Sequence, residues 1–160
     1  MATQTFRRGG PPPRREDDTN KLPQAQPVKY FDADGRLRPA LVDEEAEAWA
    51  KKFTEIKASQ LRRFYETVLN LKRRLELAAE SGLNRDAAFE RLRAEFKMLR
   101  AKAVYTRGRA ASREKNAFTN LLQFFTNHTA AVQNARDFAA FYQHFQAVMA
   151  FHKFYAPKEG

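Results

Sequence analysis

The sequence predicts an all-α fold, a compact bundle of about five helices behind a disordered N-terminal arm. Six of the seven prolines lie within the first 39 residues, and the seventh is Pro157. The interval between them holds only two glycines after residue 41, Gly82 and Gly108, and its apolar residues recur at steps of three and four. Such steps place side chains on one face of a helix. The predicted division is a mixed-charge, proline-rich arm over residues 1–41, a helical bundle over residues 42–156 and a tail over residues 157–160.

Charge order marks the first helix. Asp43 is its predicted N-cap, because three glutamates follow closely and two lysines come about two turns later. This order is the one that a helix dipole favours. The apolar side of this helix consists of Ala46, Trp49, Ala50, Phe53 and Ile56.

Gly82 separates the second and third predicted helices, since glycine commonly ends a helix. Ser59 is the predicted N-cap of the second helix. Asn84 or Asp86 starts the third helix, which runs to Gly108. Their apolar stripes consist of Leu61, Phe64, Val68, Leu71, Leu75 and Ala78 in the second helix and of Phe89, Leu92, Phe96, Leu99 and Ala103 in the third.

The last two predicted helices are rich in phenylalanine. Ser112 is the predicted N-cap of the fourth helix, and the fifth starts near Asn134 or Arg136. No segment with the alternating pattern of a strand competes with these assignments. Buried positions are predicted at Phe118, Leu121, Leu122, Phe125, Thr129 and Val132 in the fourth helix and at Phe138, Phe141, Phe145 and Val148 in the fifth.

The net charge favours a polyanionic partner. The 29 Lys plus Arg outnumber the 19 Asp plus Glu, which gives a net charge of +10. Charge alone does not separate nucleic acid from a membrane surface, but no apolar run is long enough to span a bilayer and no signal peptide is recognisable. The lack of cysteine excludes disulfides, thiolate zinc sites and cysteine nucleophiles. We therefore expect a soluble, cytoplasmic protein without a membrane partner.

Positive charge is concentrated in the second and third helices and the loop after them. Residues 57–115 hold sixteen Lys or Arg against seven Asp or Glu, whereas residues 116–156 hold two against one. For any single side chain, an ordinary solvated helix face is the better interpretation. For residues 91–115, which hold nine positive and two negative side chains, neutralisation by an anion such as phosphate is the better one.

A phosphate site is predicted around Gly108. Lys102, Arg107 and Arg109 lie where one helix ends in a sharp turn and the next begins, and helix N-termini and arginines both bind anions. The alternative is that these cations only complement the negative end of their own helix. Tyr105 either stacks on a nucleotide or packs the helix junction, and packing is the favoured interpretation.

The sequence gives catalysis little support. The three histidines lie on the two nearly neutral helices, away from the basic cluster. His152 shares a stripe with Phe138 and Phe145, which predicts a buried structural residue, and its spacing from His144 does not suit one shared metal ion. The sequence contains no nucleotide-binding loop, carboxylate cluster or nucleophile elbow. We expect no catalytic residue, metal site or cofactor.

Four aromatic residues lie outside the main apolar stripes of the last two helices. They exceed what one face of a small bundle must bury, which predicts a protein interface. The alternative is that they cover the ends of the bundle. These residues are Phe124, Phe151, Phe154 and Tyr155.

Three motifs resemble a known family. They are "SQLR" at residues 59–62, "KAVYTRGR" at residues 102–109 and "FHKF" at residues 151–154. In this order and spacing they resemble the Csm small subunit of type III-A CRISPR effector complexes, over roughly residues 42–156. Ala103 and Val104 depart from the family pattern, which has a larger aliphatic residue and an alanine there, and the proline-rich arm has no counterpart.

The resemblance implies a non-catalytic subunit of an antiviral defence complex. Such subunits stack in several copies along guide RNA and target RNA, beside a filament of larger subunits, and contact the RNA backbone while base pairing carries specificity. Lys102 and Arg109 belong to the family motif. The side chains expected on the RNA face are Gln60, Arg62, Arg63, Arg100, Lys102, Arg107 and Arg109.

Three alternatives stay open at the level of sequence. The first is a helical spacer whose aromatic helices bind neighbouring subunits, with little direct RNA binding. The second is the related small subunit of type III-B complexes. An enzyme is the third and has the least support.

Overall fold

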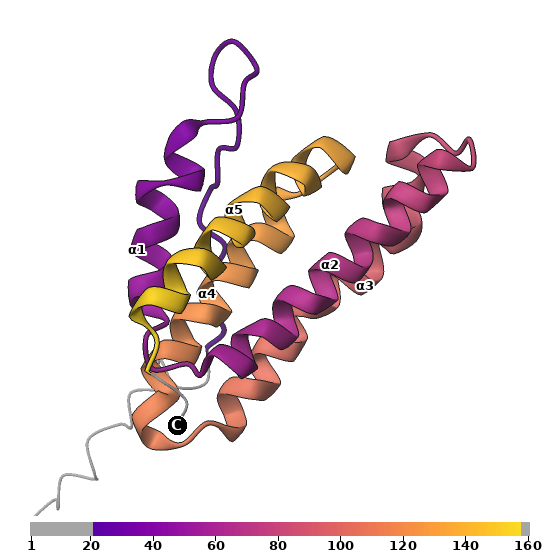
Figure 1. The fold of residues 1–160 in the computed structure, drawn as a ribbon. Coiled ribbons are helices and arrows are strands. Elements are labelled where there is room, and N and C mark those ends of the chain that lie inside the picture. The colour runs from indigo at the N-terminus through magenta and orange to yellow at the C-terminus, as the bar shows by residue number, and fades with distance from the viewer. Residues whose placement is uncertain (1–20, 158–160) are drawn as a thin grey trace, which may run out of the picture.

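The computed structural model describes residues 21–157 and is built from helices (Figure 1). Its α-helices are α1 (Glu44–Lys52), α2 (Ala58–Glu80), α3 (Arg85–Arg109), α4 (Lys115–Ala131) and α5 (Ala135–Tyr155). Two short 3-10 helices, η1 (Pro39–Val42) and η2 (Ser112–Glu114), precede α1 and α4. The predicted all-α fold of five helices is confirmed. In this part of the chain, extended pairing is limited to one isolated bridge between Phe31 and Leu37.

Helices α2 and α3 form a long hairpin that extends past the other helices at its closed end (Figure 1). Helix α5 packs against α1, α2 and α3, and α4 packs against α3 and α1. Helix α3 therefore contacts three helices, namely α2, α4 and α5. The open end of the hairpin lies beside the start of α4 (Figure 1).

Several predicted helix boundaries are confirmed by local geometry. Gly82 adopts φ 99°, in the left-handed region that favours glycine, so α2 ends where predicted. The Asn84 side chain accepts hydrogen bonds from two backbone N–H groups of the first turn of α3, including that of Asp86 at 2.9 Å. Asn134 caps α5 in the same way, accepting from the backbone N–H of Asp137 at 2.8 Å.

Asp43 is the N-cap residue of α1 as predicted, whereas the predicted N-caps Ser59 and Ser112 are wrong. Helix α1 begins just after Asp43, but the side chain of Asp43 makes no capping hydrogen bond. Ser59 lies inside the first turn of α2, where the backbone N–H of Lys57 instead donates to the Gln60 Oε1 at 3.3 Å. Ser112 opens the 3-10 turn that precedes α4, because a short turn intervenes before the α-helix starts.

Phe124 is a core residue, which corrects its prediction as part of a protein interface. Its side chain is fully buried. Its ring lies 5.6 Å from that of Phe53 in α1 and 5.5 Å from that of Phe145 in α5, measured between centroids. Helix α4 is covered from more than one direction and needs more than one apolar face, so a position outside its main stripe is still buried.

Residues 21–38 form a strap that lies against the bundle. This corrects the prediction of a mobile arm up to residue 41, while residues 1–20 lie outside the described part of the chain. Tyr30 is 4% exposed, and its hydroxyl lies 2.7 Å from the His128 Nδ1 on α4. The backbone N–H of Gln26 donates to the Asn127 Oδ1 at 2.8 Å. Aromatic burial and polar contacts therefore hold the strap in place.

A tight turn closes the strap. Gly35 adopts φ 76°, and the Asp32 Oδ1 accepts hydrogen bonds from the backbone N–H groups of Asp34 and Arg36, both at 2.9 Å. The guanidinium of Arg136 on α5 lies 3.8 Å from the centroid of the ring of Phe31. The turn is thus attached to the N-terminal end of α5.

The three histidines are buried, and a ring nitrogen of each contacts another group of the protein. His152 is 1% exposed and its Nε2 lies 2.9 Å from the carbonyl oxygen of Ile56, which confirms the prediction of a structural residue. The Nδ1 of His144 contacts the carbonyl oxygen of Leu41. Burial lowers the pKa of each histidine below its usual value, and for His128 the neighbouring His144 adds to the effect.

We expect Phe124→Ala to lower the free energy of unfolding by about 3 to 5 kcal/mol, because it leaves a cavity among packed rings. Chemical denaturation of the purified chain measures this change. Phe154→Ala is the control, since Phe154 is 81% exposed and its loss changes stability by about 0.5 kcal/mol or less. Equal effects of the two substitutions would contradict the buried position of Phe124.

We expect stability to fall as the pH is lowered from about 7 to 5. Because the folded-state pKa of His128 is depressed, the unfolded chain takes up a proton near its ordinary pKa of 6.5 while the folded chain does not. This histidine contributes a slope of up to about 1.4 kcal/mol per pH unit in that window. Urea unfolding at several pH values measures the slope, which should be shallower in His128→Gln. An unchanged slope would show that His128 is not held neutral.

Candidate nucleic-acid interface

The basic side chains predicted for RNA binding form no ion pairs among the described residues. By contrast, Arg74 pairs with Glu95 at 2.6 Å and Arg85 with Glu76 at 3.1 Å near the closed end of the α2–α3 hairpin. Those two pairs lower the pKa of each carboxyl group through their hydrogen bonds. The cations left without a carboxylate partner are Arg62, Arg63, Arg100, Lys102, Arg107 and Arg109.

Part of the predicted set meets in a groove of about 440 Å³ between α2 and α3, which we call the α2–α3 groove. Gln60 and Arg63 line it from α2, and Lys102 lines it from α3. Its apolar lining includes Phe64 and the exposed side chain of Met98. The groove therefore combines two cations with an apolar surface, the arrangement on which proteins bind unpaired nucleotides.

Tyr105 lines the same groove and is 65% exposed, so the interpretation that it packs the helix junction is wrong. The Arg109 Nη1 donates to the Tyr105 hydroxyl at 2.9 Å. The Arg109 guanidinium also lies 5.6 Å from the ring centroid. Arg109 thus steadies an exposed aromatic ring and adds positive charge beside the α2–α3 groove.

Gln60 has a structural role as well. Its Oε1 accepts the hydrogen bond from the backbone N–H of Lys57 at the start of α2. The carboxamide nitrogen is therefore the part of Gln60 that can donate to a ligand, for which a phosphate oxygen is a suitable acceptor.

Arg100 lies on the other side of α3, in a second groove of about 760 Å³ that we call the α3–α4 groove. This groove is lined by Lys97 and Arg100 of α3, by Thr126 of α4 and by residues 22–25 of the strap. The Nε of Arg100 and the hydroxyl of Thr126 are both buried, and neither has a hydrogen-bond partner in the described part of the chain. The structure therefore separates Arg100 from Gln60, Arg63 and Lys102, which line the other groove.

Arg107 joins two helices. Its Nε donates to the Thr119 Oγ1 on α4 at 2.7 Å, and that hydroxyl donates to the carbonyl oxygen of Lys115 at 2.8 Å. Helix α3 ends at Arg109, so the helix end predicted around Gly108 is confirmed to within one residue, although Gly108 itself lies inside α3. The contact of Arg107 positions the α3–α4 junction, while the rest of its guanidinium remains available to an anion.

Arg62 is exposed on α2 and lines neither groove. Residue 62 lies one position before Arg63, about 100° away around the helix, so the two side chains leave α2 in different directions. The structure groups Arg63 with Lys102 and places Arg62 apart from them.

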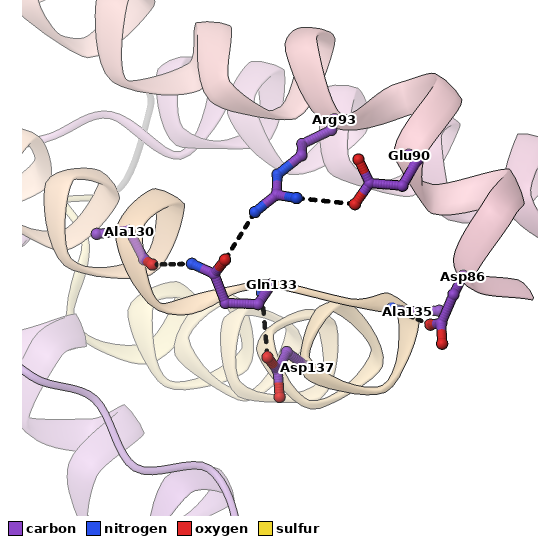
Figure 2. Close-up of polar contacts among 7 residues, drawn as sticks. All are labelled: Asp86, Glu90, Arg93, Ala130, Gln133, Ala135 and Asp137. Atoms are coloured by element: carbon purple, nitrogen blue, oxygen red, sulfur yellow. Dashed lines mark hydrogen bonds and ion pairs between the residues drawn. The ribbon is translucent and has the colours of Figure 1, made fainter.

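Arg93 continues the stripe of Lys97 and Arg100 but is occupied by protein contacts (Figure 2). Its Nη1 donates to the Glu90 Oε1 at 2.8 Å, and its Nη2 donates to the Gln133 Oε1 at 2.7 Å. Gln133 in turn donates to the carbonyl oxygen of Ala130 at the end of α4. Arg93 therefore fixes the α4–α5 turn against α3 and is unavailable as a free cation.

Sequence reasoning missed Met98, Ala101 and Thr126. Met98 and Ala101 share one helical face with Lys102 and Tyr105, at steps of three, four and seven residues. That periodicity would have identified their face. Thr126 carries no such signal, because its position in the α3–α4 groove depends on how α4 packs against α3.

An aromatic and basic patch lies at the C-terminal end of α5. Phe154 is 81% exposed, Tyr155 contacts it edge to face, and Phe151 is half-buried. The Lys51 Nζ lies 5.5 Å from the centroid of the Tyr155 ring. Three of the four aromatic residues predicted at an interface are therefore at least partly accessible.

The described helices include none that is long and apolar enough to cross a bilayer. Across residues 21–157, His, Asp and Glu side chains do not gather in a group of three or more that suits a metal ion. The histidines, which are the usual general bases, point to Tyr30 and to backbone carbonyl groups instead.

Comparison with known proteins gives one match. A family model described as Csm2 Type III-A matches residues 36–158, which is most of the chain and includes the end of the strap. No curated protein matches the chain, and no solved structure does so.

Proposed function

The chain belongs to the Csm2 Type III-A family, and from this premise we propose that it is a non-catalytic small subunit that binds the backbone of guide and target RNA in a type III-A CRISPR effector complex. The observation that carries the proposal is the α2–α3 groove, where Arg63 and Lys102 flank the exposed ring of Tyr105. Cations and an accessible aromatic ring together suit a polynucleotide chain.

Backbone binding explains why these cations have no carboxylate partners. Contacts from Lys and Arg to phosphate give affinity without sequence preference, and a subunit that serves any guide needs affinity of this kind. Specificity then comes from base pairing between guide and target. A non-catalytic role is supported by the histidines, since all three are buried in structural contacts.

The aromatic and basic patch around Phe154 supports contacts with other proteins of the assembly. An exposed aromatic residue of this size is a common anchor in protein interfaces. We assign this end of α5 to larger subunits or neighbouring copies of the chain in the cytoplasm. The second candidate function, a spacer with little RNA contact, rests on this patch alone. The type III-B alternative is disfavoured because the matching family model is that of type III-A.

We expect the double substitution Lys102→Ala and Arg109→Ala to weaken retention of RNA by the assembled complex while helicity is unchanged. Loss of two phosphate contacts to a single strand should flatten the log–log dependence of affinity on salt by about 1.4, from about 0.7 per contact. Filter binding at several salt concentrations measures this slope, and circular dichroism measures helicity.

The matched control is the double substitution Arg74→Ala and Arg85→Ala, which removes the same charge from residues that pair with Glu95 and Glu76. Its salt slope should stay close to that of the unchanged chain. Retention of RNA by the Lys102 and Arg109 variant at physiological salt would remove the α2–α3 groove from the proposed function.

We expect Phe154→Ala to reduce co-purification with the larger subunits without changing the affinity of the isolated chain for RNA. Leu77→Ala is the control, because Leu77 is also exposed, at 64%, but lies near the closed end of the α2–α3 hairpin. Adding Phe151→Ala should deepen the assembly defect. Assembly loss in these variants, combined with no effect of the Lys102 and Arg109 variant on RNA, would favour the spacer.

A further inference from the structure

Ala101 lines both the α2–α3 groove and the α3–α4 groove. We propose that one single strand of nucleic acid crosses α3 over Ala101, with phosphates held in both grooves. This inference rests on the proposed function and adds the path of the strand to it. Three features of the described residues support it. They are the small side chain of Ala101 between the two grooves, the unpaired cations on both sides of α3 and the stacking surface on the side of α2.

The surface of α3 between the two grooves is low at Ala101. This residue is exposed and has the smallest side chain that keeps a helix regular. The residues one turn away on either side are larger, with Met98 and Tyr105 on the side of α2 and Lys97 and Val104 on the side of α4. A chain that passes over α3 at Ala101 therefore meets no obstacle and has both grooves within reach.

Each groove offers cations that the protein leaves free. Arg63 and Lys102 line the α2–α3 groove, and Lys97 and Arg100 line the α3–α4 groove, none of them paired with a described carboxylate. Arg100 is half-buried, and its Nε is buried without an acceptor among the described residues. The buried Nε is closed to solvent, so the terminal Nη1 and Nη2 groups are the donors of this guanidinium that a phosphate can reach.

The strap forms the outer wall of the α3–α4 groove. Residues 22–25 line the groove, and the carbonyl oxygen of Gln24 accepts a hydrogen bond from the Gln123 Nε2 at 2.9 Å. Because Tyr30 and Gln26 also attach the strap to α4, the wall is fixed relative to Arg100. The groove is thus bounded on both sides by ordered protein.

A polynucleotide strand fits these features better than an acidic peptide does. The exposed ring of Tyr105 and the thioether of Met98 provide a surface on which bases stack. The Asp and Glu side chains of an acidic peptide have no ring that could stack there. The two grooves lie about one helix diameter apart, roughly 10 Å, which a few nucleotides span.

Ala101→Glu tests the crossing without removing any cation. In a titration of the full chain with a labelled single-stranded oligouridylate, we expect this variant to bind about tenfold more weakly, because the new carboxylate lies under the phosphates. Ala94→Glu is the matched control, since Ala94 is exposed on the same face of α3 and lines neither groove. It lies seven residues, about 10 Å, away, where salt screens its charge, so its affinity should change by about twofold or less.

A second pair of variants separates this inference from the proposed function. If one strand fills both grooves, Lys97→Ala with Arg100→Ala should flatten the salt slope by about 1.4, as the Lys102 and Arg109 variant does, and the two effects should add in the combined variant. The stoichiometry should be one strand per chain.

The outcomes are distinct. If the Lys102 and Arg109 variant loses affinity while the Ala101→Glu variant and the Lys97 and Arg100 variant do not, the proposed function stands and the crossing is overturned. If none of the variants loses affinity, both are overturned. Binding of two strands per chain, or competition by oligoglutamate as effective as that by oligouridylate, also overturns the crossing.

Discussion

The packing of α3 against both α2 and α4 is the constraint on which the α2–α3 groove and the α3–α4 groove depend. One apolar face of α3, with Phe96 and Leu99 fully buried, serves the core. The polar positions that border this face are therefore divided, some turned toward α2 and others toward α4. One groove lies along the contact of α3 with α2 and the other along its contact with α4, and Ala101 lies between the two grooves. A single packed helix thus presents two cation-lined grooves within one helix diameter.

Paired and unpaired cations lie toward opposite ends of the α2–α3 hairpin. Toward its closed end, arginines form ion pairs that join α2 to α3 or tie the turn to α2, as Arg74 with Glu95 and Arg85 with Glu76. Toward its open end, Arg63 and Lys102 form no ion pair with any carboxylate in residues 21–157, and Arg107 makes a neutral contact with Thr119. Unpaired positive charges repel one another and favour an anionic ligand. The ion pairs therefore lie toward one end of the hairpin, and the cations that we propose for RNA binding lie toward the other.

Buried polar groups of α4 and α5 hold the N-terminal strap rather than a substrate. His128 contacts Tyr30 and Asn127 contacts Gln26, while His144 contacts the carbonyl oxygen of Leu41 in η1, which follows the strap. A buried polar group is costly unless it is hydrogen-bonded, so these contacts are needed once the helices are packed. They also set the outer wall of the α3–α4 groove, because residues 22–25 belong to the same strap. The strap thus connects the packed core with the α3–α4 groove.

Local patterns in the sequence were sufficient to predict the helices, since apolar periodicity and the caps Asn84 and Asn134 act within a few residues. They also identified the cations, because charge is visible in composition. The strap was missed because Tyr30 and His128 are 98 positions apart and no periodicity links them. Burial of Phe124 and the separation of Arg100 from Lys102 depended on which helix lies on each side, and only the assembled bundle decides that.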